Sequence, residues 1–451
     1  MTKAPDTALS PAPVSFVQAL KFWLWLGCVS FGGPAGQIAL MHEELVVRRR
    51  WISEKRYLHA LHYCMLLPGP EAQQLATYTG WLMHGTRGGI AAGALFVLPS
   101  LVLLMVLSWA YTVWGQHPWG QALLWGLKPA VTALVLQAAH RMAKRTLKDR
   151  WLWLLAALSL LGTLWGVPFP VIIVGAAAMG FYRARHRLDM PTLTPPPSAD
   201  TASTHSAAWL DDHSEQGQHT HHSPKRLWRA LAVGLGLWAL SWGLIAWLFG
   251  MGHTLTQMGG FFTQSALLTF GGAYAVLPFV TQAAVVQYGW LTAAQMMDGL
   301  ALGETTPGPL IMVVAFVGFV GAYVQASFGP ENAFAAGALA AALVTWFTFL
   351  PSFVFILAGG PLVESTHGDL KFTAPLLAIT AAVVGVVLNL AIFFAYHVWF
   401  PQGLNGQPDW LSVLISTGAV AALFYFKRTV LEVLGGSALI GVGLVFWGGL
   451  S

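Results

Sequence analysis

Long apolar segments separated by short polar clusters run along almost the whole chain. An α-helix needs about 20 apolar residues to cross a bilayer. Segments near that length or longer lie at 90–113, 119–140, 227–249, 331–358, 374–399, 409–426 and 429–448, and a tighter pair of apolar segments lies at 151–164 and 168–182. The pattern therefore predicts an all-α, polytopic membrane protein in which nearly every part of the chain enters the bilayer.

Three further apolar segments contain a break. Residues 14–47 are interrupted at Phe31-Gly32-Gly33-Pro34, and the segments 57–84 and 296–324 each contain Pro-Gly-Pro. Proline lacks an N–H group and drives the preceding residue toward extended geometry, while glycine permits a sharp reversal. Because lipid cannot satisfy the freed backbone groups, these breaks must be buried in protein or line a wet cavity.

Composition agrees with a membrane protein. The chain has 451 residues, of which 56% are hydrophobic and 9% are charged, whereas soluble domains carry about 25% charged residues. Cys28 and Cys64 both fall in apolar segments and form no metal-ligand pattern. We therefore expect a chain surrounded by membrane lipids, with no metal, cofactor or nucleic-acid partner. Assembly into a homo-oligomer stays open.

Three motifs recur along the chain at one spacing. Phe31-Gly32-Gly33 returns as Phe270-Gly271-Gly272, Trp51 returns as Trp290, and the first Pro-Gly-Pro returns as the second. Each recurs 239 residues later (270 − 31, 290 − 51 and 307 − 68). Such a constant offset indicates an internal duplication. Beyond it the spacing changes, since Leu98-Pro99-Ser100 returns as Leu350-Pro351-Ser352.

Basic residues are concentrated in the first half of the chain, where 20 of 23 Lys and Arg lie at or before Arg229. The loop 48–56 holds five of them, while its counterpart 281–295 holds none. Because cytoplasmic loops are enriched in Lys and Arg, equivalent loops with opposite bias belong on opposite membrane faces. The two halves are therefore predicted to be inverted repeats, as in many secondary transporters.

The same rule constrains the first Pro-Gly-Pro segment. The basic clusters at 48–56 and 141–150 both belong in the cytoplasm, and the two helices 90–113 and 119–140 together cross the membrane twice. Residues 57–84 must then enter and leave on one face, as a re-entrant hairpin. The alternative is a broken span that leaves one basic loop outside.

The predicted organisation has five parts. These are an N-terminal tail (1–13), a first repeat (14–187), a flexible, cytoplasmic, His-rich linker (188–226), a connecting transmembrane helix (227–250) and an inverted second repeat (251–451). The linker is also rich in Pro, Ser, Thr and Asp, a composition typical of exposed spacers.

A helix that begins inside the membrane suits a bound anion, because its first N–H groups are unpaired and its N-terminus carries partial positive charge. The residues expected to line such a site surround the breaks: Gly32, Gly33, Pro68, Gly69, Pro70, Gln74, Thr77, Gly271, Gly272, Thr305, Thr306, Pro307, Gly308 and Pro309. Lys128, within the apolar segment 119–140, or Arg87 would supply positive charge. Either side chain could instead reach the membrane interface and act as an anchor. No catalytic residue is expected.

Glu304 is the candidate for ion coupling. It lies within the apolar run 296–324, where a charged carboxylate costs at least ~2.5 kcal/mol. It must be protonated, paired with a cation or exposed to water, and each of these states suits a coupling role. Alternatively, Glu304 hydrogen-bonds a helix N-terminus and only holds the break in shape.

These motifs, in this order, resemble the signature of the chromate ion transporter family. The resemblance rests on Phe31-Gly32-Gly33-Pro34, Trp51, Pro68-Gly69-Pro70, Gln74-Leu75-Ala76-Thr77, Gly80, Gly88-Gly89, Leu98-Pro99, Phe270-Gly271-Gly272 and Glu304-Thr305-Thr306-Pro307-Gly308-Pro309. It covers nearly the whole chain apart from the tail and the linker. The length and the duplication resemble the long-chain, two-domain type of that family.

The resemblance implies a secondary active transporter of the bacterial inner membrane that exports chromate and gives chromate resistance. Transport would be driven by the membrane potential or by antiport of an ion. Sulfate has the same shape and charge as chromate, so the alternative is an exporter or exchanger of sulfate or another anion. A membrane-embedded chromate reductase is a rival of another class, but the sequence carries no nucleotide, flavin or haem motif.

Overall fold

The computed structural model of this protein describes residues 13–186, 208–210, 223–365 and 373–446. Within these residues the structure is helical, which confirms the predicted all-α class. The first repeat contains α1 (Phe16–Val29), α2 (Gly33–His42), the π-helical turn η1 (Glu43–Arg48), α3 (Glu54–Leu66), α4 (Glu71–Trp114), α5 (Pro118–Thr146), α6 (Arg150–Leu164) and α7 (Phe169–Arg185).

Helix α8 (Pro224–Phe249) connects the first repeat to the second. The second repeat contains α9 (Thr254–Leu268), α10 (Ala273–Thr281), the π-helical turn η2 (Gln282–Gln287), α11 (Ala293–Thr305), the 3-10 turn η3 (Leu310–Met312), α12 (Val313–Val324), the 3-10 turn η4 (Pro330–Asn332), α13 (Ala333–Ser365), α14 (Thr373–Trp399), α15 (Trp410–Phe424) and α16 (Val430–Phe446).

The order of elements in the first repeat returns in the second, at the spacing of the sequence motifs. Helix α3 corresponds to α11 and turn η1 to η2, each displaced by 239 residues (293 − 54 and 282 − 43). Matching caps start the two helices: Ser53 accepts the N–H of Arg56, and Thr292 accepts that of Gln295. The repeats therefore share local structure as well as motifs. Their inversion across the membrane stays a prediction.

Proline ends the first arm of each broken segment. Leu67, directly before Pro68, has φ −87° and ψ 148°. Thr306, directly before Pro307, has φ −96° and ψ 147°. This is the extended geometry that a following proline imposes, so α3 and α11 cannot continue through the motif.

Each Pro-Gly-Pro forms the turn of an antiparallel helical hairpin. In the first repeat, Tyr63 on α3 faces Tyr78 on α4, with 5.7 Å between the ring centres. In the second, Gly299 on α11 lies against the ring of Phe316 on α12. Helix α4 then bends back on itself at 84–85, where the backbone angles are not helical.

The hairpin arms are too short to cross a bilayer. Helices α3 and α11 each have 13 residues, which is about 20 Å of helix. The hydrocarbon core of a bilayer is about 30 Å thick. A hairpin with such arms turns round inside the core and returns to the face it entered from. The geometry therefore favours the re-entrant hairpin over the broken span.

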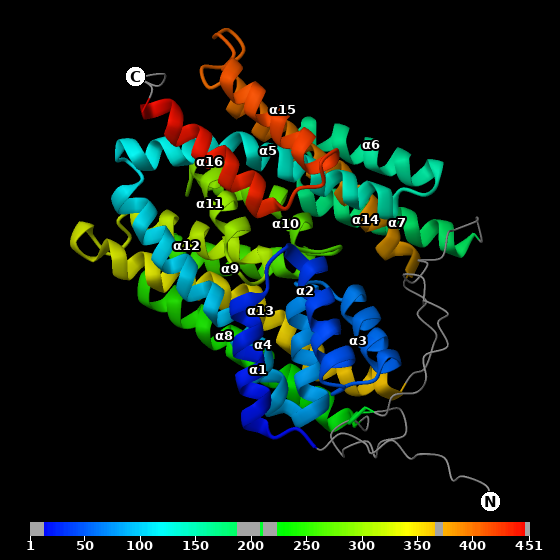
Figure 1. The fold of residues 1–451 in the computed structure, drawn as a ribbon. Helices are drawn as coiled ribbons and strands as arrows, with labels where there is room; N and C mark the ends of the chain where they lie inside the picture. Colours follow the sequence, from blue (N-terminus) through cyan, green and yellow to red (C-terminus); the bar gives the residue numbers. More distant parts are fainter. Residues whose placement is uncertain (1–12, 187–207, 211–222, 366–372, 447–451) are drawn as a thin grey trace, which may run out of the picture.

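The last two helices of each repeat pack on the other repeat. Helices α6 and α7 contact α14, whereas α15 and α16 contact α5, and α5 and α14 contact each other. Figure 1 shows these six helices gathered in the upper part of the molecule, above α1, α3, α4, α8 and α13. Such reciprocal contacts are expected of two similar units related by a two-fold axis.

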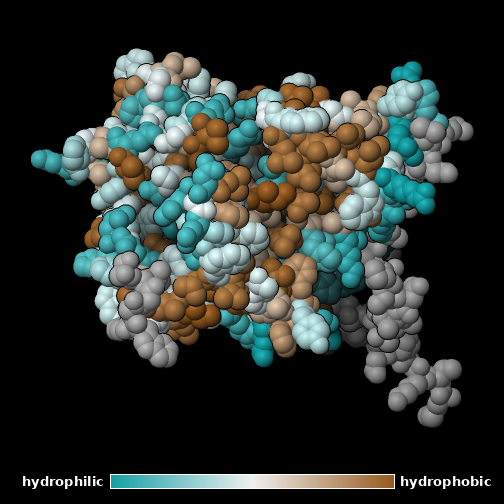
Figure 2. Space-filling view, turned by 90° about the horizontal axis from the view of Figure 1, so that it is seen from above, coloured by the Kyte–Doolittle hydropathy of each residue, from teal (hydrophilic) through white to brown (hydrophobic). Residues whose placement is uncertain are grey.

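Large apolar side chains cover much of the outer surface. Trp165 on the α6–α7 turn, Leu240 on α8 and Trp247 on α8 are 82%, 70% and 80% exposed. Figure 2 shows broad apolar patches on one face of the molecule. Among the described residues, five helices are long and apolar enough to span a membrane, namely α4, α5, α8, α13 and α14. The protein is therefore a multi-pass membrane protein.

Three residues of the predicted linker dock on the first repeat. Leu210 forms an isolated parallel β-bridge with Ile52, and the N–H of Trp209 donates to the carbonyl oxygen of Arg50 at 3.0 Å. The ring of Trp209 lies 6.0 Å from that of His84, at the bend of α4. The sequence alone predicted one uniformly exposed spacer. Most of that spacer (188–207 and 211–222) lies outside the described residues.

Candidate functional site

The two Pro-Gly-Pro turns are hydrogen-bonded to the opposite repeats. The N–H of Gly69 donates to the carbonyl oxygen of Thr269 at 2.8 Å, and the N–H of Gly308 donates to that of Ser30 at 2.7 Å. We call these contacts the first joint and the second joint. The two bonds are equivalent under the 239-residue offset (308 − 69 and 269 − 30). Since Thr269 and Ser30 directly precede the Phe-Gly-Gly motifs, both kinds of break meet at each joint.

Only glycine fits at the centre of each joint. Gly69 and Gly308 have φ of +123° and +104°, a region that residues with a side chain rarely adopt. A Cβ atom on Gly69 would lie 2.5 Å from Oγ of Ser352, and one on Gly308 would lie 2.6 Å from Cβ of Ser100. The two serines belong to the recurring Leu-Pro-Ser motif on α13 and α4. Each joint therefore packs a tip of one repeat against a long helix of the other.

Helix N-termini gather at the joints. Helix α4 starts beside the first joint and η3 with α12 beside the second, while α10 and α2 follow Thr269 and Ser30 after a few residues. In the described part of the chain, none of these four starts has a side chain that caps it with a hydrogen bond. Uncapped starts leave N–H groups and partial positive charge available to an anion.

The four predicted glycines of the Phe-Gly-Gly turns lie in these connections. All have positive φ: Gly32 +89°, Gly33 +68°, Gly271 +84° and Gly272 +97°. Glycine allows the chain to turn sharply from α1 into α2 and from α9 into α10. The residues directly before the two Phe-Gly-Gly motifs thus contact the Pro-Gly-Pro turns. That these glycines line an anion site stays a prediction.

A buried polar layer surrounds the first joint. Gln74 donates from Nε2 to the carbonyl oxygen of Pro68 at 2.7 Å and lies 3.4 Å from Oγ of Ser352. Gln73, directly before Gln74, donates from Nε2 to Oγ1 of Thr77, one turn further along α4, at 3.0 Å. Gln73, Gln74 and Thr77 are fully buried, and Oε1 of both glutamines has no hydrogen-bond partner among the described residues. Unpartnered amide oxygens are acceptors, so at this position they suit a hydrogen-bond donor such as water.

The second joint is held by a residue that the sequence analysis missed. Gln37 on α2 is fully buried, and its Nε2 donates to the carbonyl oxygen of Gly308. Its Oε1 and the hydroxyl of Ser100 have no partner among the described residues. The hydroxyls of Thr305 and Thr306 donate to carbonyl oxygens of their own helix, at 2.9 Å each. A lone glutamine in an apolar helix just after Phe-Gly-Gly-Pro was the available signal.

Glu304 has a tyrosine as its hydrogen-bond partner. The hydroxyl of Tyr274, on α10, donates to Oε1 of Glu304 at 2.5 Å. The guanidinium of Arg141, near the end of α5, interacts electrostatically with both Tyr274 and Glu304. The charge of Arg145 acts in the same way on Glu71, the buried first residue of α4. From the sequence, these two arginines were assigned only to membrane topology.

Lys128 lies away from the joints. Its Nζ is 3.7 Å from Oδ1 of Asp298 on α11. Asp298 precedes Pro307 by nine residues (307 − 298), roughly 13 Å along a helix. The structure therefore separates Lys128 from the tips, and its role in binding stays a prediction. Arg87, the alternative cation, is exposed just after the bend in α4.

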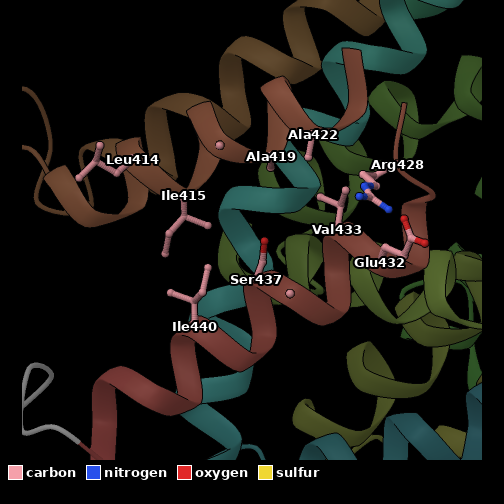
Figure 3. Close-up of a pocket in the computed structure, with 11 residues that line it drawn as sticks. Leu414, Ile415, Ala419, Ala422, Arg428, Glu432, Val433, Ser437 and Ile440 are labelled. Atoms are coloured by element: carbon pink, nitrogen blue, oxygen red, sulfur yellow. The ribbon is translucent and has the colours of Figure 1, made fainter. Parts of the chain in front are cut away.

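A groove elsewhere in the molecule contains none of these residues. It lies between α15 and α16, has a volume of about 780 Å³, and is lined mainly by apolar side chains such as Leu414, Ile415 and Ile440 (Figure 3). Arg428 and Glu432 mark one end of it. Because the joints are built from other helices, we place the candidate site at the joints and not in this groove. Within the described residues, no three His, Cys, Asp or Glu side chains are grouped to hold a metal.

Comparison with known proteins agrees with the recurring motifs. The family model described as "Chromate transporter" matches residues 17–181 and 256–442, that is, both repeats. No solved structure matches the chain.

Several curated relatives match over most of their length. A chromate transport protein of Pseudomonas aeruginosa is 32% identical over 86% of this chain and 83% of its own. A chromate transport protein of Cupriavidus metallidurans is 27% identical over 97% of this chain and 96% of its own. A probable chromate transport protein of Synechococcus elongatus is 27% identical over 92% of each.

Proteins with these names are transporters and not enzymes, which sets the reductase alternative aside. The predicted family resemblance is confirmed by a match that spans both repeats. The chain belongs to the chromate transporter family.

Proposed function

We propose that this protein is a secondary active transporter that exports chromate across the bacterial inner membrane and thereby gives chromate resistance. Membership of the family supports a chromate or similar oxyanion substrate. The observation that carries the proposal is the pair of joints, where two helix breaks from opposite repeats meet and uncapped helix N-termini gather.

At the joints, free N–H groups would replace water around the oxyanion, because helix N-termini favour anions. The proposed lining is the set Gly32, Gly33, Pro68, Gly69, Pro70, Gln74, Thr77, Gly271, Gly272, Thr305, Thr306, Pro307, Gly308 and Pro309. Gln37 is added because it holds the second tip. Lys128, on α5, would bind the anion at a second position, beside Asp298 of α11 and away from the two tips.

Glu304 is proposed to couple export to the movement of protons in antiport. Its carboxylate lies next to the second tip and accepts a hydrogen bond from Tyr274. An intramembrane carboxylate changes its charge on binding a proton, and that change alters its interaction with Tyr274 and with the charge of Arg141. Protonation at Glu304 could therefore bias the second tip between two positions.

In the proposed topology, the two repeats are inverted and the basic loops of the first repeat lie in the cytoplasm with the linker. The asymmetric distribution of Lys and Arg supports this orientation. The two re-entrant hairpins would then approach from opposite faces and meet at the joints. Alternating access would follow from rocking of one repeat against the other around a fixed midplane site.

Sulfate is the second candidate substrate. It has the same tetrahedral shape and charge as chromate, and backbone N–H groups offer no feature that separates the two. A proteoliposome assay with chromate and sulfate in competition decides between them. Chromate flux that an excess of sulfate fails to reduce would identify a chromate-selective protein.

The experiment that tests the proposed function is chromate uptake by energised everted membrane vesicles, which measures export. We expect uptake with the wild-type protein and strong loss with Pro68→Ala, Gly308→Ala or Lys128→Ala. Gly329→Ala is the matched control, because Gly329 also has positive φ (+84°) but a Cβ there meets nothing within 4 Å. Uptake that survives all three site changes would refute the site. Absence of uptake with the wild-type protein would refute chromate export.

A further inference from the structure

A buried carboxylate that belongs to none of the predicted sites links the two repeats. Asp298 on α11 is only 3% exposed. Its Oδ2 accepts a hydrogen bond from the hydroxyl of Tyr111 at 3.1 Å, and its Oδ1 lies 3.7 Å from Nζ of Lys128. Tyr111 on α4 and Lys128 on α5 belong to the first repeat, and Asp298 belongs to the second. The cluster therefore carries a charge interaction across the boundary between repeats.

The ion pair in this cluster is loose. A separation of 3.7 Å is longer than a hydrogen bond, and Oδ1 of Asp298 has no hydrogen-bond partner among the described residues. An ammonium group offers three donors. The side chain of Lys128 is 25% exposed, whereas that of Asp298 is 4% exposed. An ion can therefore approach Lys128 while the carboxylate stays fixed by Tyr111.

The repeated fold does not itself require this cluster. Under the 239-residue offset, the position equivalent to Asp298 is His59 (298 − 239). The same hairpin is thus built twice, once with an aspartate at this position and once without. A carboxylate needed only to hold the hairpin would be expected in both copies, so the asymmetry points to a role in transport.

A lone lysine in an apolar segment poses a problem for an anion transporter. Unpaired charge within the membrane is unfavourable, and a bare cation would hold a dianion too tightly to release it. Transport requires binding that is favourable enough for entry and weak enough for exit. A carboxylate that competes for the same ammonium group meets both requirements.

We propose that Asp298 is a built-in counter-anion for Lys128. It neutralises Lys128 when no substrate is present, yields the ammonium group to an arriving tetrahedral dianion, and takes it back as the dianion leaves. Tyr111 is a positioning residue, because its hydroxyl keeps the carboxylate close enough to return. The inference rests on the proposed anion transport and names the residue that sets its affinity.

The test is anion uptake by proteoliposomes, with KM measured separately for sulfate and chromate. Asp298→Asn should lower KM about five- to tenfold, the size of a typical coupling between two sites, and should also lower the maximal rate because release is slowed. Tyr111→Phe keeps the carboxylate and should shift KM in the same direction by a smaller factor. It therefore tests the idea even if Asp298→Asn fails to fold.

Glu44→Gln is the matched control. Glu44 is another buried carboxylate, 5% exposed, which pairs with Arg48 and Arg49 at 3.0 Å and lies outside α11. We expect it to leave KM unchanged. The double variant Lys128→Met/Asp298→Asn gives a further comparison. A purely structural ion pair predicts wild-type kinetics for the double variant, whereas a counter-anion predicts a KM above the wild-type value.

Proton concentration supplies an independent measurement. The titratable groups that act on Asp298 are Lys128 and Tyr111. Protonation of Asp298 should free Lys128, so KM for sulfate should fall as pH falls in the wild type. The fall should be smaller in Asp298→Asn, where the proposed proton site at Glu304 still titrates but residue 298 does not. Sulfate is the probe because it remains a dianion throughout. If the wild-type protein takes up sulfate or chromate, but KM is unchanged or raised in both Asp298→Asn and Tyr111→Phe, the counter-anion role of Asp298 is overturned and the proposed function stands. If the wild-type protein takes up neither anion, the proposed function is overturned.

Discussion

The N–H of Gly308 donates to the carbonyl oxygen of Ser30 at 2.7 Å, and a Cβ atom on Gly308 would lie 2.6 Å from Cβ of Ser100 on α4. Gly308→Ala should therefore destabilise the protein by about 1–3 kcal/mol through overpacking, with further strain from its positive φ. Thermal unfolding in detergent measures the loss. Ser100→Gly removes the clashing atom, so the double variant Gly308→Ala/Ser100→Gly should recover part of it. Additive losses would show that the two residues do not touch.

Gln37→Leu should weaken the second joint. The substitution leaves the buried carbonyl oxygen of Gly308 without its side-chain donor, and a buried acceptor left unpaired costs about 1–3 kcal/mol. Gln257→Leu is the control, since its amide also donates to a carbonyl oxygen, that of Gly252, but at an exposed position. We expect a clear fall in the melting temperature for Gln37→Leu and little change for Gln257→Leu. Equal changes would contradict a special role for the second joint.

Glu304→Gln should uncouple anion transport from the proton gradient. The amide cannot take up a proton, so uptake should no longer respond to an imposed pH gradient, while exchange of one anion for another should continue. Tyr274→Phe removes the hydrogen bond to Oε1 and should alter the response in part. Glu331→Gln, in the exposed turn η4, provides the control. A full response to the gradient in Glu304→Gln would exclude this residue as the coupling group.

Trp209→Ala should release the docked linker residues. The indole contacts His84 and the backbone on either side pairs with the loop 50–53. Burial of a large apolar side chain contributes about 1.5–3 kcal/mol, so its loss should open this contact and speed proteolysis within 188–226 several-fold. Trp228→Ala, on the exposed face of α8, is the control. Cleavage at the wild-type rate would mean that the β-bridge alone holds the segment.

Local features of the fold could be predicted because they depend on local chemistry. Proline and glycine act on their own backbone, so the turns at 68–70 and 307–309 and the broken run 14–47 were located correctly. The constant 239-residue offset then identified equivalent elements. The joints could not be predicted, since a hydrogen bond between Gly69 and Thr269 leaves no periodicity or composition signal at either position.

Two functional candidates were missed for different reasons. Asp298 lies within the same apolar run as Glu304, and a carboxylate in such a run was a signal that applied equally to both. Gln37 was overlooked because its helix is short and was treated only as part of a break. The choice of helix partners could not be predicted at all, because apolar helices such as α6 and α14 carry no sequence mark that specifies a neighbour.

The exchange of helix pairs between repeats has a consequence for synthesis of the chain. Helices α6 and α7 pack on α14, where Gly180 approaches the carbonyl oxygen of Ala374. The end of α14 leaves the ribosome 214 residues after the end of α7 (399 − 185), a delay of about 10–40 s at 5–20 residues per second. During that time the close-packing face of α7 has only lipid or the insertion machinery against it. A chain stopped before α14 would therefore keep this face of α7 unpaired and become a target for degradation, even though the first repeat is complete in sequence.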